Sequence, residues 1–178
     1  MAEREQSGGS GRRPIIGIMG ASQASSRSVA AARELGELVA ERGWIVLTGG
    51  RPAGVMAAAC AGAKRVRNSL TLGILPGAEG AGSDVDIAVF TAMGDARNAI
   101  NVLTSDVVVA CGVEGPGTAS EVSLALKAGK PVILLAAAQA ARVFFESLET
   151  RGRLFGADAP IDVVRLIEVD LAIPHWSP

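Results

Sequence analysis

Residues 106–135, DVVVACGVEGPGTASEVSLALKAGKPVILL, contain a complete strand–helix–strand pattern. The apolar run 106–112 predicts a buried strand, and the glycine-rich turn after it leads into a predicted helix over 118–128 that ends at Gly129. The apolar run 131–135 predicts the next strand. Because short, continuously apolar strands separated by helices are typical of parallel sheets covered on both faces, this stretch predicts an α/β fold.

The same alternation extends through the rest of the chain. Its 178 residues are enough for one domain with a sizeable core. We therefore expect a Rossmann-like, doubly wound sheet, mostly parallel, with helices on both faces. The expected strands are 14–20, 44–50, 70–76, 85–90 and a last strand or edge at 163–169, and the expected helices are 27–42, 52–66, 94–104 and 138–150. The predicted organisation is a disordered lead over 1–13, a single ligand-binding domain over 14–170 and a tail over 171–178.

Composition narrows the range of partners. The formal net charge is −1 and no basic stripe is present, which argues against nucleic acid as a main partner. Crossing a membrane needs about 20 consecutive apolar residues, and no stretch is that long. Cys60 and Cys111 lie far apart among small or apolar residues, which predicts buried free thiols and a cytoplasmic protein. We expect no metal site, with Asp84 and Asp86 in turn and edge roles and His175 without a catalytic one.

Glycine and small polar residues gather where three of the predicted strands end. The turns are GASQASS (20–26), TGGRPAG (48–54) and GVEGPGT (112–118). The carboxyl ends of parallel strands meet at one edge of a sheet, where glycine lets a ligand approach the backbone and helix N-termini bind anions. Short strand-to-helix turns also need glycine for their own geometry, so the alternative is purely structural. The candidate residues for binding a phosphorylated small molecule are Gly20, Ser22, Thr48, Gly49, Gly50, Arg51, Asn98, Gly115, Gly117 and Thr118.

Two common nucleotide-binding motifs are missing. The first strand carries Gly17-Ile18-Met19-Gly20 and not G-x-G-x-x-G, and the second ends in Thr48-Gly49-Gly50 with no acidic residue for a ribose hydroxyl. No G-x-x-x-x-G-K-[ST] motif occurs either. The sequence therefore disfavours an NAD enzyme and a P-loop enzyme.

Arg97 and Glu121 are the candidate catalytic residues, and each has an alternative role. Thr118-x-x-Glu121 before an apolar helix has the spacing of a capping box, which needs no ligand. Alternatively, the Glu121 carboxylate could stabilise positive charge at a sugar carbon. Arg97 could bind a phosphate with its guanidinium group or form a surface ion pair. The residues alone leave these alternatives open.

Three segments carry a resemblance to a known superfamily: TGGRPAGVMAAACAGAK (48–64), AMGDARNAINVLTSDVVVA (92–110) and GPGTASEVSLALKAGKPVILL (115–135). Together they resemble the Lonely Guy (LOG)-like Rossmann superfamily, many of whose members were labelled "possible lysine decarboxylase". The likeness covers roughly residues 14–135 and is greatest to the branch that includes the molybdenum cofactor carrier proteins. It implies a homo-oligomer, a dimer or tetramer.

This resemblance implies two functions. LOG enzymes hydrolyse the N-glycosidic bond of nucleoside 5′-monophosphates, and Arg97 and Glu121 match the pair that they use at the ribose. Their P-G-G-x-G-T-x-x-E motif is altered here, since Val113 and Glu114 replace the Pro and the first Gly, and Asp95-Ala96 replaces a His-Glu pair. These departures favour a binding or carrier protein for a nucleotide- or pterin-like ligand, with molybdenum cofactor as the candidate. The alternative is a phosphoribohydrolase, and whether turnover occurs is left open.

Overall fold

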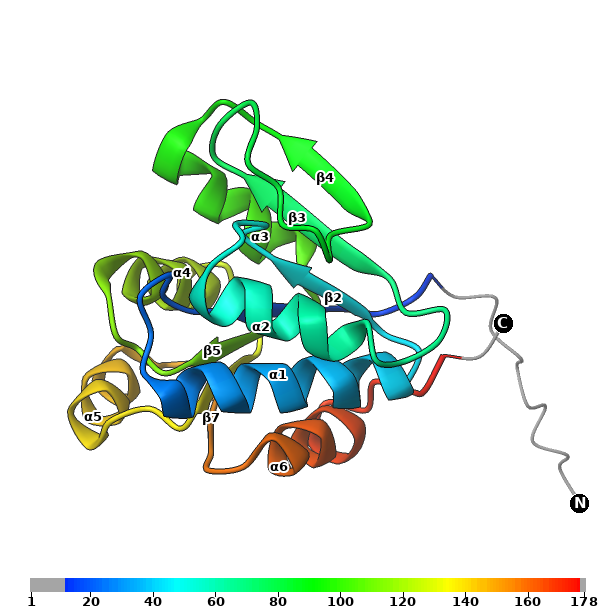
Figure 1. Cartoon of the computed structure of the whole chain (residues 1–178). Helices are drawn as coiled ribbons and strands as arrows, with labels where there is room; N and C mark the ends of the chain where they lie inside the picture. Colours follow the sequence, from blue (N-terminus) through cyan, green and yellow to red (C-terminus); the bar gives the residue numbers. More distant parts are fainter. Residues whose placement is uncertain (1–11, 177–178) are drawn as a thin grey trace, which may run out of the picture.

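A seven-stranded parallel sheet forms the centre of the computed structural model, which describes residues 12–176 (Figure 1). The strands are β1 (Ile15–Met19), β2 (Ile45–Thr48), β3 (Thr71–Leu75), β4 (Ile87–Phe90), β5 (Val107–Cys111), β6 (Val132–Leu135) and β7 (Leu154–Ala157). The α-helices are α1 (Ser26–Glu41), α2 (Gly54–Ala63), α3 (Asn98–Thr104), α4 (Pro116–Lys127), α5 (Gln139–Leu148) and α6 (Pro160–Arg165). A 3₁₀-helix, η1 (Gly94–Arg97), precedes α3, and a π-helix, η2 (Leu166–Asp170), follows α6.

The order of the strands confirms the predicted doubly wound fold. Across the sheet the order is β4-β3-β2-β1-β5-β6-β7, and every neighbouring pair is parallel. The chain moves outward from β1 to β4 and then returns to place β5 on the other side of β1. The connections after β1 and after β5 therefore lead in opposite directions, which opens a crevice at the carboxyl ends of these two strands.

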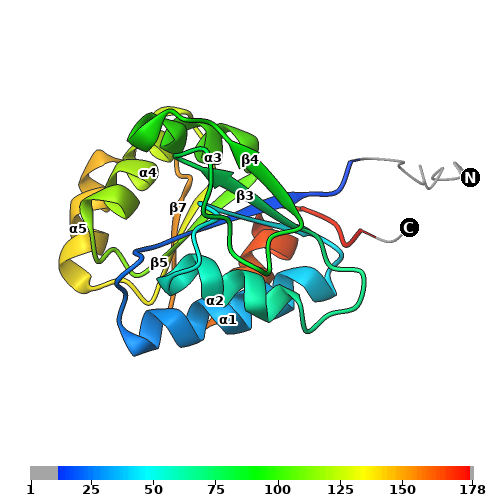
Figure 2. The same cartoon turned by 45° about the horizontal axis from the view of Figure 1, so that its top comes forward.

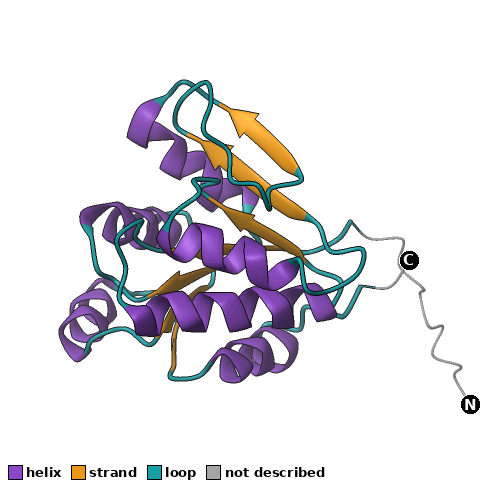
Figure 3. Cartoon of the chain, viewed as in Figure 1, coloured by secondary structure: helices purple, strands orange, loops and turns teal. Residues whose placement is uncertain are grey.

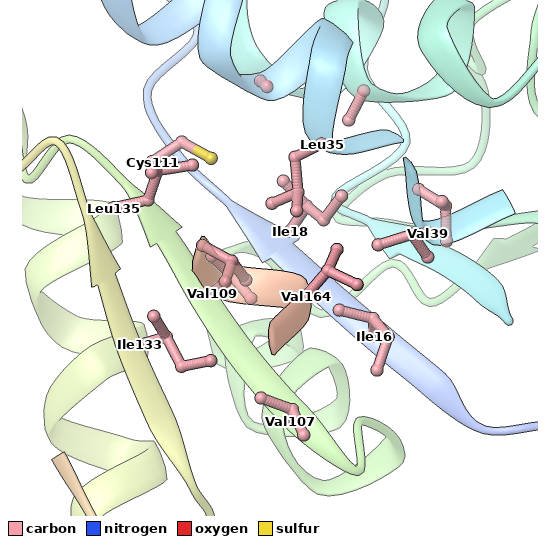
Figure 4. Packing of buried hydrophobic residues seen from close by; sticks show 14 of the residues in the cluster. Ile16, Ile18, Leu35, Val39, Val107, Val109, Cys111, Ile133, Leu135 and Val164 are labelled. Atoms are coloured by element: carbon pink, nitrogen blue, oxygen red, sulfur yellow. The ribbon is translucent and has the colours of Figure 1, made fainter. Parts of the chain in front are cut away.

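Helices cover both faces of the sheet (Figures 2 and 3). Alternate residues of β5 point to opposite faces, as expected for a strand. Val107 and Val109 pack in the cluster that contains residues of α1, α2 and α6, whereas Val108 and Ala110 pack with residues of α4 and α5. Figure 4 shows the first of these clusters, where strand residues lie beneath Leu35 and Val39 of α1 and Val164 of α6. Since both faces are buried, the strand is apolar throughout.

Helices α1 and α2 lie in close contact because each helix has a glycine where the two meet. A Cβ atom added at Gly36 of α1 would collide with the carbonyl oxygen of Ala59, and one added at Gly62 of α2 would collide with that of Arg33. The alanine-rich segment 57–63 of α2 thus packs against α1 within the chain. The close contact also holds α1, and with it the loop that precedes it, against the sheet.

The prediction of a last strand at 163–169 is wrong. Those residues belong to α6 and η2, and the seventh strand is β7, which pairs with β6. Pro160 occupies the first turn of α6, where its missing N–H costs nothing. Val163, Val164 and Ile167 are fully buried at helical spacing, so the apolar run belongs to a helix face. The four residues of β7 include a single buried one, which explains why the sequence pattern does not reveal this strand.

The described chain ends contact the domain near the amino end of β2. Arg13 donates to the carbonyl oxygen of Gly43 at 2.7 Å, and its guanidinium lies 4.6 Å from the centre of the Trp176 ring. The Trp44 indole N–H donates to the carbonyl oxygen of Pro174 at 2.7 Å. Residues 1–11 of the predicted lead and 177–178 of the predicted tail lie outside the described residues. Within 12–176, none of the helices has both the length and the apolar character needed to cross a bilayer.

Candidate ligand-binding site

A cavity of about 320 Å³ opens where β1, β2 and β5 end. The loop after β1 contributes residues 20–23, the loop after β2 contributes Gly49 and Arg51, and the loop after β5 contributes residues 114–118. The three glycine-rich turns therefore meet at one edge of the sheet. The cavity lies at the reversal of strand order between β1 and β5, which is where open α/β sheets bind their ligands.

The N-terminus of α4 forms one wall of the cavity. Gly115 is the N-cap in an extended conformation, and Pro116 occupies the first helical position. The backbone N–H groups of Gly117 and Thr118 fall in the first turn, where an α-helix offers no internal acceptor. A Cβ atom added at Gly115 or Gly117 would meet nothing within 4 Å, so packing within the chain does not require glycine there. The wall is thus open, and the twelve-residue helix directs its positive end into the cavity, which favours binding of an anion there.

Arg97 and Glu121 meet in the floor of the cavity. They come from η1 and α4, their exposed fractions are 7% and 6%, and Arg97 Nη1 lies 3.5 Å from Glu121 Oε1. Asn101 of α3 donates from Nδ2 to the same carboxylate oxygen at 2.8 Å. Arg97 Nε and Asn101 Oδ1 are buried and have no hydrogen-bond partner. An unpaired donor on a buried cation is costly to keep, so the protein's own groups within residues 12–176 do not fully satisfy Arg97.

Burial governs the ionisation of this pair. Desolvation raises the pKa of Glu121, opposed by the hydrogen bond from Asn101 and by the charge of Arg97. Desolvation likewise lowers the pKa of Arg97, opposed mainly by the Glu121 carboxylate. Each charge thus depends on the other for compensation, and a bound anion would add to the compensation of Arg97.

Gly49 gives the Arg97 guanidinium the space that it occupies. A Cβ atom added at Gly49 would lie 2.8 Å from Arg97 Nη2 and 2.8 Å from Met56 Sδ. Any side chain at this position would therefore displace the arginine or the methionine. This contact supplies a specific reason for glycine at the end of β2.

The capping-box interpretation of Glu121 is wrong. Helix α4 begins at Pro116, so Thr118 is its third residue and Glu121 its sixth, and the Gly115 N-cap makes no side-chain hydrogen bond. The rigid ring of Pro116 favours a helix start two residues before Thr118. Glu121 instead pairs with Asn101 and Arg97. The interpretation of Arg97 as a surface ion pair is also wrong, because both partners are buried.

Glu114 projects toward the start of α1. Its carboxylate accepts hydrogen bonds from the backbone N–H of Ser25 at 2.7 Å, from Ser25 Oγ at 2.7 Å and from Ser28 Oγ at 2.8 Å. The hydrogen bond from the Ser25 hydroxyl is the largest influence on Glu114 and lowers its pKa; desolvation opposes it, and the bonds from the Ser25 N–H and the Ser28 hydroxyl lower the pKa further. These bonds direct the carboxylate to the neighbouring helix α1.

Most of the predicted site residues line the cavity. They are Gly20, Ser22, Gly49, Arg51, Arg97, Asn98, Gly115, Gly117, Thr118 and Glu121. Thr48 and Gly50 do not line it: the Thr48 hydroxyl accepts from the Gly50 N–H at 3.1 Å, and Gly50 packs against Gly73. Both shape the turn that presents Gly49 and Arg51.

Several residues of the site went unassigned in the sequence. Gln23, Met56 and Asp95 line the cavity. Gln23 lies within the first glycine-rich turn, so its position was a usable signal. Met56 carried none, because a residue inside a helix gains its place in a site only from packing. Asn101, for which the sequence suggests either a hydrogen bond at this edge or a solvated helix position, is buried and donates to Glu121.

Asp84, Asp86 and the two cysteines have the structural roles that the sequence predicts. Asp86 accepts hydrogen bonds from Lys64 Nζ and Thr71, and the backbone carbonyl of Asp84 accepts from the Thr71 hydroxyl. Cys60 and Cys111 are buried free thiols. Among residues 12–176, no cluster of three or more His, Cys, Asp or Glu side chains could hold a metal ion.

Comparison with known proteins places this chain in a family. The model of the SLOG cluster4 family matches residues 13–164. The molybdenum cofactor binding protein of the phototrophic bacterium Rippkaea orientalis is 46% identical, with a TM-score of 0.85 over 90% of this chain and 98% of that one. The molybdenum cofactor carrier protein of Chlamydomonas reinhardtii is 44% identical, with a TM-score of 0.83 over 90% of this chain and 100% of that one. An uncharacterised protein of Archaeoglobus fulgidus is 41% identical over 121 residues, 67% of this chain and 78% of that protein. The chain therefore belongs to the SLOG cluster4 family, a LOG-like Rossmann group close to the molybdenum cofactor carrier proteins.

Proposed function

We propose that this protein binds and carries molybdenum cofactor, a pterin that ends in a phosphate monoester. The observation that carries the proposal is the 46% identity, over 90% of this chain, with a protein named for binding this cofactor. The cavity supports the proposal independently, because it combines an open helix N-terminus with a buried arginine, Arg97, whose charge is paired, within residues 12–176, with the Glu121 carboxylate alone.

The residues that line the cavity suit such a ligand. The phosphate would accept hydrogen bonds from the N–H groups of Gly117 and Thr118 and would be paired with the guanidinium of Arg97, which lines the cavity beside Glu121. A pterin ring carries both donors and acceptors at its edge. Gln23 and Asn98 both line the cavity, and their side-chain amides offer donors and acceptors.

Carriage without turnover is favoured by the residues in which this chain departs from the LOG motifs. The altered residues at 95–98 and 113–114 leave the LOG constellation incomplete. The Glu121 carboxylate, which accepts a hydrogen bond from Asn101 and lies beside Arg97, would then serve to position the ligand.

Hydrolysis of a nucleoside 5′-monophosphate is the second candidate function. It is favoured by one observation: Arg97 and Glu121 line the same cavity, with 3.5 Å between the guanidinium and the carboxylate. Such a pair could bind the ligand and stabilise positive charge at the anomeric carbon of a ribose.

The carrier function is tested by what co-purifies with the protein. The protein would be expressed in a bacterial host that makes the cofactor and purified without oxygen, and its molybdenum and oxidised pterin contents would be measured by mass spectrometry and fluorescence. We expect both in a fixed ratio to protein, and a strong loss of both in Arg97→Lys, which keeps the charge but not the planar fork. Arg67→Lys, at an exposed arginine away from the cavity, is the matched control. Wild-type protein free of both components would refute the carrier function.

The hydrolase function is tested with adenosine 5′-monophosphate as the substrate. Release of adenine by the wild type, and its loss in Glu121→Gln, would establish the second function in place of the first. Under the carrier proposal, neither protein releases adenine above the rate of a buffer blank.

The setting in which the protein acts follows from the same proposal. We infer a cytoplasmic homo-oligomer, a dimer or tetramer, whose ligand is a small molecule and not a nucleic acid. Edge strand β4 supports assembly, since its Ile87 and Phe90 side chains are about half exposed. Light scattering coupled to size-exclusion chromatography measures the assembly, and a monomer would contradict it.

A further inference from the structure

Helix α4 begins at the wall of the cavity, and helix α1 begins three residues after Gln23, which also lines it. The two N-termini differ in how they are capped. The first turn of α4 has no side-chain cap and no acidic residue. The start of α1 is capped by Ser25, whose hydroxyl accepts from the Ser28 N–H, and the carboxylate of Glu114 lies on both serines. A negative charge from within the chain therefore occupies the N-terminal end of α1, where the helix dipole favours it.

The Glu114 contact crosses the crevice between β1 and β5. Glu114 belongs to the loop after β5, whereas Ser25 and Ser28 follow β1, 89 and 86 residues away along the chain. The contact joins the two loops whose separation defines the cavity, and Glu114 itself lines the cavity. The Glu114 side chain therefore helps to set the distance between the two loops, and with it the width of the crevice.

The backbone is shaped to allow this contact. Gly112 has a φ of +63°, and a Cβ atom there would lie 2.5 Å from Ser28 Oγ and 3.1 Å from Glu114 Oε1. A residue with a side chain at this position would both strain the backbone and obstruct the three hydrogen bonds. Glycine at the end of β5 therefore has a specific reason, which is the close approach of Glu114 to α1.

The charges on the cavity wall are close to balanced. The basic groups are Arg51 and Arg97, and the acidic groups are Asp95, Glu114 and Glu121. Glu121 is paired with Arg97 at the α4 side, so Glu114 is the carboxylate that a ligand anion would meet on the α1 side. An anion can enter beside α4 and Arg97, but it is repelled from the start of α1.

We propose that Glu114 is a positioning and specificity-determining residue, which closes the N-terminus of α1 to ligand anions, leaves that of α4 as the phosphate site, and so selects ligands with a single phosphate over diphosphates. This inference rests on the phosphate site of the proposed function. A second phosphate that extended across the crevice would meet the Glu114 carboxylate in place of an open helix end.

The test follows individual backbone amides while inorganic phosphate or pyrophosphate is titrated into ¹⁵N-labelled protein at constant ionic strength. In the wild type, the amides of Gly117 and Thr118 are expected to shift and saturate, and those of Arg27 and Ser28 to remain in place. In Glu114→Gln, the Arg27 and Ser28 amides are expected to shift as well. The affinity for pyrophosphate relative to phosphate should then rise about fivefold, the effect of removing one unit charge about 4 Å away in water.

Glu146→Gln is the matched control, because it removes one charge from an exposed position on α5 and should behave as the wild type. Glu114→Ala is the second variant, and melting temperatures report whether each protein remains folded. Wild-type shifts at Arg27 and Ser28, or an unchanged ratio in both Glu114 variants, would overturn the inference. If the α1 amides shift in the Glu114 variants but the α4 amides shift in none of the proteins, the role of Glu114 is upheld and the phosphate site of the proposed function is rejected. No response anywhere would reject both.

Discussion

The buried pair of Arg97 and Glu121 leads to a quantitative prediction about stability. At a separation of 3.5 Å, two unit charges attract by about 5 kcal/mol if the effective dielectric constant is about 20. Water in the open cavity reduces this energy, so we expect a coupling free energy of about 1–3 kcal/mol in a double-mutant cycle. Glu121→Gln keeps an acceptor for Asn101 but leaves the Arg97 charge without its partner, and Arg97→Met does the converse.

The assay is urea unfolding of the wild type, both single variants and the double variant, followed by tryptophan fluorescence. Trp44 is fully buried and reports on loss of the core. Each single variant should lose about 2–3 kcal/mol of unfolding free energy, near the lower end for broken buried pairs, and the double variant should lose less than their sum. The exposed pair of Arg65 and Glu37, 3.0 Å apart, serves as the control with a coupling of about 0–1 kcal/mol.

Additive effects of Arg97→Met and Glu121→Gln, within about 0.5 kcal/mol, would refute the reasoning. Such a result would mean that hydration of the cavity already compensates both charges. The burial of Arg97 would then carry no argument for an anionic ligand, and the phosphate site would rest on the N-terminus of α4.

Three further predictions concern the packing, the ionisation and the thiols. Gly36→Ala should lower the unfolding free energy by about 1–3 kcal/mol, because the added Cβ atom collides with α2. Gly117→Ala should leave the stability measured in urea titrations unchanged and should weaken phosphate binding. Equal losses of stability in the two variants would contradict this prediction. Hydrogen bonds lower the pKa of Glu114 in the folded protein. The wild type should therefore have its full stability advantage over Glu114→Gln above the ordinary glutamate pKa, and this advantage should shrink as the pH falls through the lowered pKa of the folded protein. A stability advantage that grows in acid would contradict the prediction. Burial raises the pKa of Cys111 to about 12, so iodoacetamide should label this thiol only after unfolding, and rapid labelling of the native protein, detected by mass spectrometry, would exclude the packing described.

The sheet was predictable from sequence wherever a strand is buried on both faces. Strands β5 and β6 carry uninterrupted apolar residues, and β1 departs from this pattern only at Gly17. The pattern failed at the C-terminal edge, where the 163–169 run is short enough to suit a strand or a helix. Its buried positions, with Val163, Val164 and Ile167 on one face, become evident only when α6 lies against the sheet.

The site was predictable in its turns and not in its floor. Glycine-rich turns at strand ends can be identified by position, because parallel strands bring their carboxyl ends to one edge. Arg97 and Glu121 were identified through the family resemblance, while the local spacing around Glu121 pointed to a capping box. That alternative was removed by the start of α4 at Pro116, which places Thr118 inside the helix.

The sequence alone determined the fold class and the edge of the sheet at which the glycine-rich turns surround a cavity, since hydrophobic periodicity and glycine placement are local properties of the chain. Tertiary structure decided which charges compensate one another. Arg97 meets Glu121 from 24 positions away, and Glu114 reaches Ser25 across 89 positions. Local sequence carries no information about such distances, because the ionisation and reach of a side chain depend on the partners and the burial that folding brings to it.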